Sequence, residues 1–254
     1  MNSFRFGKHP PKHDYRTLRL KNYLSPDLPP PPESYDVLAS RVYDSVKVGD
    51  PTVLFPMDGN DAKGDCTIAA MAHAITVNCA LIKKKLIPDV NKVLKLYLQL
   101  TNGIDSGLAE LDVLNYWRLN GALGDHHILG FSAVDVKNIL HIKQAIFLFG
   151  GVYIGFQVQE DCLTDYQNKK PWTEGKLTTD GHAVYAVGYD NEGVTVLTWG
   201  NTQKGTWGWW NECVDEAYAI LPSEAQNQQF AGVNLAQLKD DLSRVAQGYS
   251  VGSA

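Results

Sequence analysis

The chain has 254 residues, of which 44% are hydrophobic and 20% are charged, and its net charge is -5. These values predict an ordinary globular protein of roughly one or two domains. The acidic balance, with Lys83-Lys84-Lys85 standing alone as a basic run, argues against a nucleic-acid partner. The first fifteen residues contain no apolar signal segment, and no apolar run is long enough to cross a bilayer. We therefore expect a cytoplasmic protein without a membrane partner.

The first segment, residues 1–34, is rich in basic residues and proline. It ends in Leu28-Pro29-Pro30-Pro31-Pro32, which favours an extended polyproline arm. We expect this arm to lie along the body as a structural strap, and covering of a cleft is the alternative. Residues 35–222 then read as one globular domain, and residues 223–254 read as a C-terminal helix and tail.

The first half of the globular part predicts helices. Residues 66–82 contain so few polar side chains that a helix there would be apolar nearly all round, which places it inside the molecule. Further helices are predicted at 89–101, 110–119 and 136–149, where the apolar residues recur with helical spacing.

The second half changes to the pattern of β-strands. Strands are predicted where short β-branched or aromatic segments are bounded by Gly, Asp and Asn, and these lie at 151–158, 182–189, 194–199, 206–210 and 216–221. Residues 190–193 predict a hairpin turn, and residues 235–245 a last helix. Helices first and antiparallel strands second indicate an α+β fold.

The cysteines are scattered, with no Cys-x-x-Cys pair, so we expect free thiols and no metal site; they are Cys66, Cys79, Cys162 and Cys213. Cys66 alone falls at the start of a predicted helix. There the helix dipole lowers a thiol pKa, and the backbone N–H of Cys66 is free to bind an oxyanion. Gly64, two residues before Cys66, permits close approach of a substrate backbone. A lone cysteine, however, is more often a small buried apolar residue.

Three other features have plainer interpretations. His73 lies about 10 Å along the helix from Cys66, so we interpret it as a packed core histidine. The pair His126-His127 is expected in a loop with solvated imidazoles, because two ligands rarely make a metal site. The tryptophans from Trp199 to Trp210 are expected to be core residues and shields more than sugar-binding or base-binding surfaces.

A wider pattern then becomes apparent. Asn60 precedes Cys66 by six residues, and Gly181-His182-Ala183-Val184 and the pairs Trp199-Gly200 and Trp207-Gly208 follow. Over about residues 35–221 this resembles the papain-like (C1-type) cysteine peptidases, as a divergent member of bacterial or phage type. The resemblance implies a helical left half, with a central helix starting at Cys66, and a right half of antiparallel sheet or barrel.

The resemblance also implies roles for particular residues. Cys66 matches the nucleophile, His182 the general base and acid, and Asn60 the glutamine whose amide helps form the oxyanion hole. The imidazole would hold the thiolate as an ion pair and later protonate the leaving group. Trp199 would shield the histidine from water, with Gly200 beside it. No cofactor and no metal are implied.

Two positions depart from the family pattern. The asparagine that usually orients the histidine is replaced by Leu197. Either Thr198 or Asn201 would take over that role, or the backbone alone would hold the histidine. Asp65 stands directly before the nucleophile, and its carboxylate is expected to raise the thiol pKa.

Three functional classes follow from these residues. The first is a thiol-dependent hydrolase that cleaves a peptide or related amide bond through an acyl-enzyme, with a peptide or amide as its partner. The second is an acyltransferase on the same fold. The third is a catalytically silent binding or structural protein, which the loss of the usual asparagine makes credible.

Overall fold

The computed structural model describes residues 4–223 and 232–246. Residues 1–3 of the arm lie outside the described residues, as do 224–231 and 247–254 of the C-terminal region. The described helices are α1 (Tyr43–Val46), α2 (Pro51–Leu54), α3 (Cys66–Leu81), α4 (Val90–Leu100), α5 (Glu110–Asn120), α6 (Ile139–Phe149), α7 (Cys162–Gln167), α8 (Trp207–Cys213) and α9 (Leu235–Ala246). The strands are β1 (Tyr35–Asp36), β2 (Ile128–Ala133), β3 (Val152–Gln159), β4 (Leu177–Tyr189), β5 (Gly193–Thr198), β6 (Asn201–Thr206) and β7 (Val214–Pro222).

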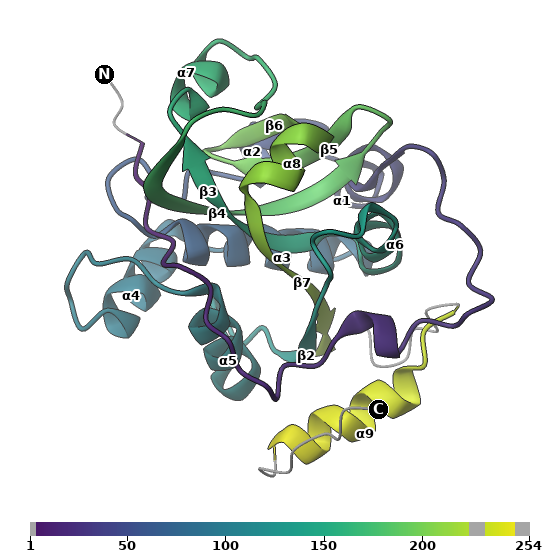
Figure 1. Cartoon of the computed structure of the whole chain (residues 1–254). Coiled ribbons are helices and arrows are strands. Elements are labelled where there is room, and N and C mark those ends of the chain that lie inside the picture. The colour runs from purple at the N-terminus through teal and green to yellow at the C-terminus, as the bar shows by residue number, and fades with distance from the viewer. Residues whose placement is uncertain (1–3, 224–231, 247–254) are drawn as a thin grey trace.

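The strands pair in an antiparallel sheet. Within the described residues their order is β2-β7-β3-β4-β5-β6, and β1 adds to β4. Figure 1 shows α4 and α5 lying together, away from the end of the sheet formed by β5 and β6. The helices α3, α4 and α5 thus form one side of the molecule and the sheet forms the other, as expected for an α+β fold, while α2 lies against β6.

The central helix α3 is buried along its length. Its residues from Cys66 to Ala80 are shielded from solvent all round, so it has no polar face. Many of its side chains are small, Ala70 and Ala74 among them, and β4 is its main packing partner. A helix enclosed on all sides has its N-terminal residue fixed by packing. The fold thereby holds Cys66 rigidly at one end of the interface between the two sides.

Hydrogen bonding at Thr206 contradicts the predicted strand at 206–210. Asn201–Thr206 is strand β6, and a short helix, α8, follows it. The Thr206 hydroxyl accepts a hydrogen bond from the Trp209 amide, which caps the first turn of this helix. Aromatic residues are typical of strands, but here Trp209 and Trp210 fill the core from a helical turn.

Strand β2 and the neighbouring His126 also differ from expectation. His126 lies in a bridge with Ala122 just before β2, and its ring is 5.7 Å from that of Trp117. His126 is buried, whereas His127 is exposed. The solvated-imidazole prediction is therefore wrong for His126, because the pairing of β2 with β7 draws this segment inward.

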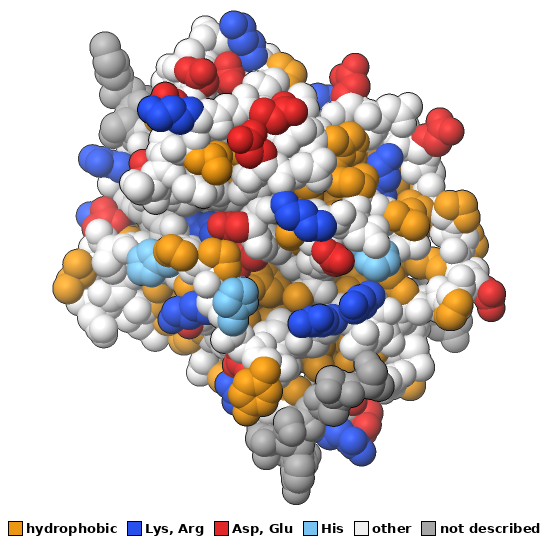
Figure 2. All heavy atoms as spheres, in the orientation of Figure 1, with side chains coloured by type: hydrophobic (Ala, Val, Ile, Leu, Met, Phe, Trp, Pro, Cys, Tyr) orange, Lys and Arg blue, Asp and Glu red, His pale blue; other side chains and the backbone are white. Residues whose placement is uncertain are grey.

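The N-terminal arm crosses one face of the molecule. Figure 1 shows it descending from beside α7, past α4 and α5, to β2. Leu18, Leu20 and Tyr23 are buried in the core, so the lower part of the arm is anchored by apolar packing. On the same face, basic and acidic side chains are interspersed and form no single-sign block (Figure 2). Among the described residues, no helix is long and apolar enough to cross a membrane.

Candidate active site

Cys66 is the first residue of α3 and is 1% exposed. The backbone amides of Ala183 and Gly7 act on its sulfur as hydrogen-bond donors. Ala183 follows His182 on β4, so the thiol of the helical side lies against the backbone next to His182. The other cysteines, Cys79, Cys162 and Cys213, are also buried.

His182 lies inside the sheet, opposite Phe156 on β3. The indole of Trp199 stacks on its ring at 4.5 Å with the planes tilted by 19°, and the Phe156 ring meets it edge-on at 5.6 Å. The Nε2 atom is 2.8 Å from the Thr198 hydroxyl oxygen. The Nδ1 atom has no hydrogen-bond partner among the residues that the structure describes. One ring nitrogen is therefore engaged, and the other is available for chemistry.

The arm covers this pair. Its residues 7–9 lie as an extended strand between the two sides: the Leu108 amide donates to the Gly7 carbonyl at 2.9 Å, and the Lys8 amide donates to the Gly181 carbonyl at 3.0 Å. The ring of Phe6 meets that of His182 edge-on at 5.6 Å. The alternative to a plain structural strap therefore applies to this part of the arm, because residues 6–9 cover the site.

Gly7 is fitted to its place by its lack of a side chain. A Cβ atom on Gly7 would lie 1.8 Å from the carbonyl oxygen of Gly64. Real Cβ atoms do not approach that closely, and a backbone oxygen cannot swing away as a side chain can. Gly64 likewise meets the arm backbone, since a Cβ atom there would lie 2.9 Å from the Phe6 carbonyl oxygen. Close backbone approach at Gly64 is thus present, with the arm as the approaching chain.

Burial under the arm keeps the sulfur protonated. Loss of solvent raises the pKa of Cys66 to about 12, and the Ala183 and Gly7 amides offset only part of this effect. Asp65 adds a smaller upward contribution. The carboxylate next to the nucleophile therefore acts in the expected direction, but desolvation is the larger cause.

Burial has the opposite effect on His182. Loss of solvent, with a further contribution from His73, lowers the pKa of His182 to about 3. A thiol with a raised pKa and an imidazole with a lowered one are both neutral at pH 7. The arm-covered form thus holds a neutral pair without a hydrogen bond at Nδ1, whereas the family resemblance implies an ion pair. The physical reason is that the arm excludes the water that would stabilise two charges.

Asn60 is 2% exposed, and its side-chain amide points toward the arm and the nucleophile loop. Its Nδ2 donates to the carbonyl oxygens of Arg5 and Lys63, each at 3.1 Å, and to Asp65 Oδ1 at 3.2 Å. The Arg5 oxygen belongs to the arm, so one contact of this amide is with a peptide carbonyl in the groove. An amide that meets a carbonyl there has the chemistry needed in an oxyanion hole.

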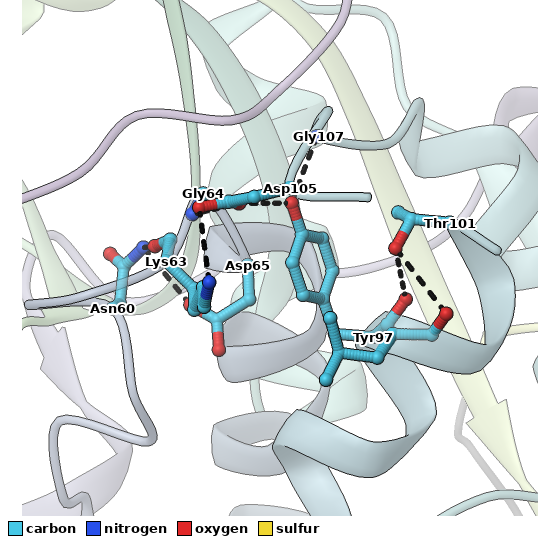
Figure 3. Close-up of polar contacts among 9 residues, drawn as sticks. Asn60, Lys63, Gly64, Asp65, Tyr97, Thr101, Asp105 and Gly107 are labelled. Atoms are coloured by element: carbon cyan, nitrogen blue, oxygen red, sulfur yellow. Dashed lines mark hydrogen bonds and ion pairs between the residues drawn. The ribbon is translucent and has the colours of Figure 1, made fainter. Parts of the chain in front are cut away.

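The loop before Cys66 is braced from α4. Figure 3 shows Asp105 as the central acceptor of this network: Tyr97 Oη donates to its Oδ1 at 2.7 Å, and the Gly64 amide donates to the same atom at 2.9 Å. Tyr97 Oη in turn accepts from the Gly107 amide at 2.9 Å. Although partial burial works against it, these hydrogen bonds lower the pKa of Asp105. Nothing in the sequence pattern marks this brace, because Gly64 lies 41 residues before Asp105.

Asp65 itself is buried, and loss of solvent raises its pKa from 3.8 to about 8 despite the hydrogen bond from Asn60. A carboxyl with a raised folded-state pKa stabilises the fold at low pH, and that contribution is lost as the pH rises through about 8. We expect Asp65→Asn to remove this loss, so that stability falls less between pH 4 and pH 8 than in the wild type. Urea denaturation at several pH values measures it.

The matched control for Asp65→Asn is Asp61→Asn, in an exposed carboxylate of the same loop. The control should keep the pH dependence of the wild type. A wild-type slope in Asp65→Asn as well would show that Asp65 is not the group that titrates.

The two candidates for orienting the histidine differ in position. Thr198 contacts His182 Nε2, as described above, whereas Asn201 is exposed and its Oδ1 accepts from the Thr202 amide. Leu197, at the position usual for the family asparagine, is buried in the core. Trp199 covers the His182 ring, and its positive φ of 45° with Gly200 at 77° makes the turn that places the indole there. The structure thus brings Thr198 to the histidine and leaves Asn201 at the surface.

Sequence reasoning did not identify the arm residues in the site, which are Phe4, Phe6, Gly7 and Lys8. Phe4 lies 5.0 Å from the Trp199 ring, so two aromatic rings of the arm pack on the shield of the histidine. The alternation Phe-x-Phe-Gly-Lys in a basic arm is the signal that could have indicated a segment bound in a groove. Among the described residues, no group of three or more His, Cys, Asp or Glu could hold a metal ion.

Comparisons with known proteins show which solved structures are similar to this chain. No protein-family model and no curated protein matches the chain. Among solved structures, it is similar to xylellain, a cysteine protease from Xylella fastidiosa, with a TM-score of 0.63 at 18% identity over 87% of this chain and 97% of that one. It is also similar to procathepsin B S9 from Trypanosoma congolense, with a TM-score of 0.57 at 13% identity over 87% and 86% of the two chains. A third likeness is to digestive procathepsin L 3 of Tenebrio molitor, with a TM-score of 0.56 at 13% identity over 82% and 76%.

These likenesses show that the chain has the papain-like α+β fold. Its helical side contains the central helix that starts at Cys66, and its other side is the antiparallel sheet that contains His182. Sequence identities of 13% to 18% carry the fold alone.

Proposed function

We propose that this protein is a thiol-dependent hydrolase that cleaves a peptide or related amide bond through a Cys66 acyl-enzyme, and that the arm-covered form is its resting state. The observation that carries the proposal is the arm itself. Its residues 7–9 lie as an extended peptide, hydrogen-bonded on both edges, with the Gly7 amide at the Cys66 sulfur. A groove that holds a main chain in this way recognises peptides through backbone hydrogen bonds, independently of side chains.

The reaction begins when the arm leaves. Water then reaches the pair, so the pKa of Cys66 falls and that of His182 rises toward their ordinary values. The thiol proton passes to His182 Nδ1, the nitrogen without a partner, and the sulfur attacks the carbonyl carbon of the substrate. The developing oxyanion accepts from the Cys66 amide and from Asn60 Nδ2.

Breakdown of the tetrahedral intermediate that this attack forms completes the first half of the reaction. The carbon–nitrogen bond breaks, Nδ1–H of His182 protonates the leaving amine, and a thioester remains on Cys66. Water, deprotonated by the same nitrogen, then attacks the thioester and releases the acid. Trp199 keeps bulk water from the other face of the imidazole, and Thr198 holds Nε2.

A catalytically silent protein is the alternative that a specific observation favours. The neutral, buried pair without a hydrogen bond between thiol and imidazole is what a chain that binds its own arm permanently would show. The two proposals differ in whether the pair becomes charged when the arm is displaced.

The test is acyl transfer by a full chain in which the arm is displaced by Gly7→Ala. This chain is incubated with a peptide mixture, and acid-quenched samples are searched by mass spectrometry for cleaved peptides and for acylated Cys66. Cleavage that disappears with Cys66→Ala supports the hydrolase. Cleavage that gives amide products with an added amine indicates an acyltransferase, and no acylation in a folded, arm-displaced chain contradicts both.

Thr198 provides a further prediction. Thr198→Val keeps the shape of the side chain and removes the oxygen at 2.8 Å from His182 Nε2. We expect kcat of the arm-displaced chain to fall about 10- to 100-fold, because a small misorientation of a catalytic group has an effect of that order. Thr198→Ser should restore most of the rate, and Asn201→Ala should leave it unchanged. Equal rates in Thr198→Val and its parent would show that the hydroxyl does not position the imidazole.

A further inference from the structure

The Lys8 side chain of the arm lies in a buried acidic pocket next to the nucleophile. Its Nζ is 2.9 Å from Asp215 Oδ1 and 3.1 Å from Glu216 Oε1, and the lysine side chain is 1% exposed. Although burial works against the charge, Glu216, Glu110 and Asp215 together raise the pKa of Lys8. The ammonium group is therefore held as a cation inside the protein.

The pocket contains a carboxyl group, that of Glu110, to which Lys8 of the arm donates no hydrogen bond. Glu110, the first residue of α5, is fully buried, and within residues 4–223 and 232–246 neither of its carboxylate oxygens has a hydrogen-bond partner. Burial, with repulsion from Glu216, raises its pKa well above the ordinary value. An unpartnered buried carboxyl is costly for the fold, so its presence points to a ligand with hydrogen-bond donors to spare.

The pocket is also shaped from the backbone. Gly155 on β3 lies opposite Glu216 on β7. A Cβ atom on Gly155 would lie 1.9 Å from Lys8 Cε and 2.9 Å from Glu110 Oε1. The missing side chain is thus the space through which the lysine stem reaches the carboxylates. The space at Gly155 therefore accommodates a long, unbranched side chain.

The pocket lies next to the nucleophile, because the residue that fills it follows the residue that covers the thiol. Gly7, whose amide acts on the Cys66 sulfur, is the immediate neighbour of Lys8, so the pocket lies about one residue along the chain from the reacting atom. A substrate in this groove would place a side chain there close to the scissile bond.

We infer that this pocket selects substrates with a basic side chain, lysine foremost, within two residues of the bond that Cys66 attacks. The inference rests on the proposed function and adds its substrate class. An apolar side chain in the pocket would leave Glu110 and Glu216 desolvated without a partner, and an acidic one would be repelled. Sites built around buried charges reject ligands that lack the matching group by large factors.

The test uses covalent probes, so its readout does not depend on turnover. In the full-length Gly7→Ala chain, Cys66 is labelled with matched peptidyl acyloxymethyl ketones, in which lysine or norleucine occupies each of the three positions before the electrophile. The sulfur displaces the acyloxy group, forming a carbon–sulfur bond and releasing a carboxylate. At one of these positions we expect the lysine probe to label Cys66 at least about tenfold faster than the norleucine probe, because the lysine forms a charge-assisted hydrogen bond in the pocket.

Two variants in the same background assign the preference to the pocket. Glu110→Gln and Glu216→Gln keep the shape and remove the charge, so each should reduce the lysine preference several-fold; thermal melts show which of them fold, and either alone carries the test. The exposed carboxylate of Asp112, which pairs with Lys12 at the arm, provides the matched control Asp112→Asn, which should keep the preference.

The outcomes separate the inference from the function. Equal labelling by lysine and norleucine probes at every position overturns the basic pocket and leaves the hydrolase standing. A lysine preference that survives both Glu→Gln variants also overturns it, because the charge would then come from elsewhere. Labelling by iodoacetamide but by neither peptide series would remove the peptide groove, and with it the proposed function.

Discussion

Replacing Gly7 by alanine is expected to raise the rate at which iodoacetamide modifies Cys66 by a factor of about 100 to 1000 at pH 7. The new methyl group would lie 1.8 Å from the Gly64 carbonyl oxygen, so the arm cannot keep its place over the sulfur. With the arm in place the pKa of Cys66 is about 12, against 9.0 for an ordinary thiol. Restoring solvent therefore increases the reactive thiolate fraction about 1000-fold.

The sign of the pH dependence is part of this expectation. In the wild type, labelling of Cys66 should remain slow throughout the neutral range and rise only at strongly alkaline pH. In Gly7→Ala it should rise at lower pH, as the pKa of the thiol falls and that of His182 rises. The measurement is the second-order rate from pH 5 to pH 10, with mass spectrometry of the Cys66 peptide to separate it from the other cysteines.

Gly49→Ala is the matched control, because a Cβ atom on Gly49 would meet nothing within 4 Å. It should label at the wild-type rate. If Gly7→Ala also labels at the wild-type rate while its arm amides stay protected from hydrogen exchange, the arm is not what closes the site.

The second large effect is expected from Lys8→Met. This change keeps a long side chain but leaves Glu110, Glu216 and Asp215 without their cation. Breaking a buried ion pair from one side costs about 3–5 kcal/mol when the remaining charges stay buried. The loss is smaller where the arm leaves the pocket and lets water reach the carboxylates. We therefore expect a lower free energy of unfolding together with loss of arm protection, measured by urea denaturation and hydrogen exchange.

The loss in Lys8→Met should depend on pH in a definite direction. The pKa values of Glu110 and Glu216 are raised in the folded chain by burial, and Lys8 holds them down. Without Lys8 they rise further, so both groups are neutral and tolerated near pH 4 and become costly as the pH rises. The variant should thus lie near the wild type at pH 4 and well below it at pH 8.

Lys12→Met is the control for this series, because Lys12 is an arm lysine whose pair with Asp112 is exposed to solvent. Exposed pairs of this kind contribute less than about 1 kcal/mol. Similar losses in Lys8→Met and Lys12→Met at pH 8 would contradict the buried pocket.

Local sequence determined the elements whose signals are local. Residues 66–82 are apolar nearly all round, which predicts a buried helix. The observed helix α3, Cys66–Leu81, follows this prediction closely. The pattern around His182 is that of a buried strand and became β4. The strand predicted at 206–210 was wrong because the Thr206 cap outweighs the β preference of three tryptophans. The papain-like fold was expected only from the resemblance of the segments around Cys66, His182 and Trp199 to that family.

Tertiary structure alone decided the state of the site. The sequence predicts Cys66 and His182 as partners, but their neutral form depends on burial by the arm, and burial is set by where distant segments lie. It likewise could not predict that Thr198 reaches Nε2 and that Asn201 does not, since a turn at Trp199 and Gly200 sets those directions. The acidic pocket is the clearest case: Lys8, Glu110 and Glu216 are ordinary charged residues along the chain. They become a site because folding brings them together without water, where an unmatched charge is too costly to leave alone.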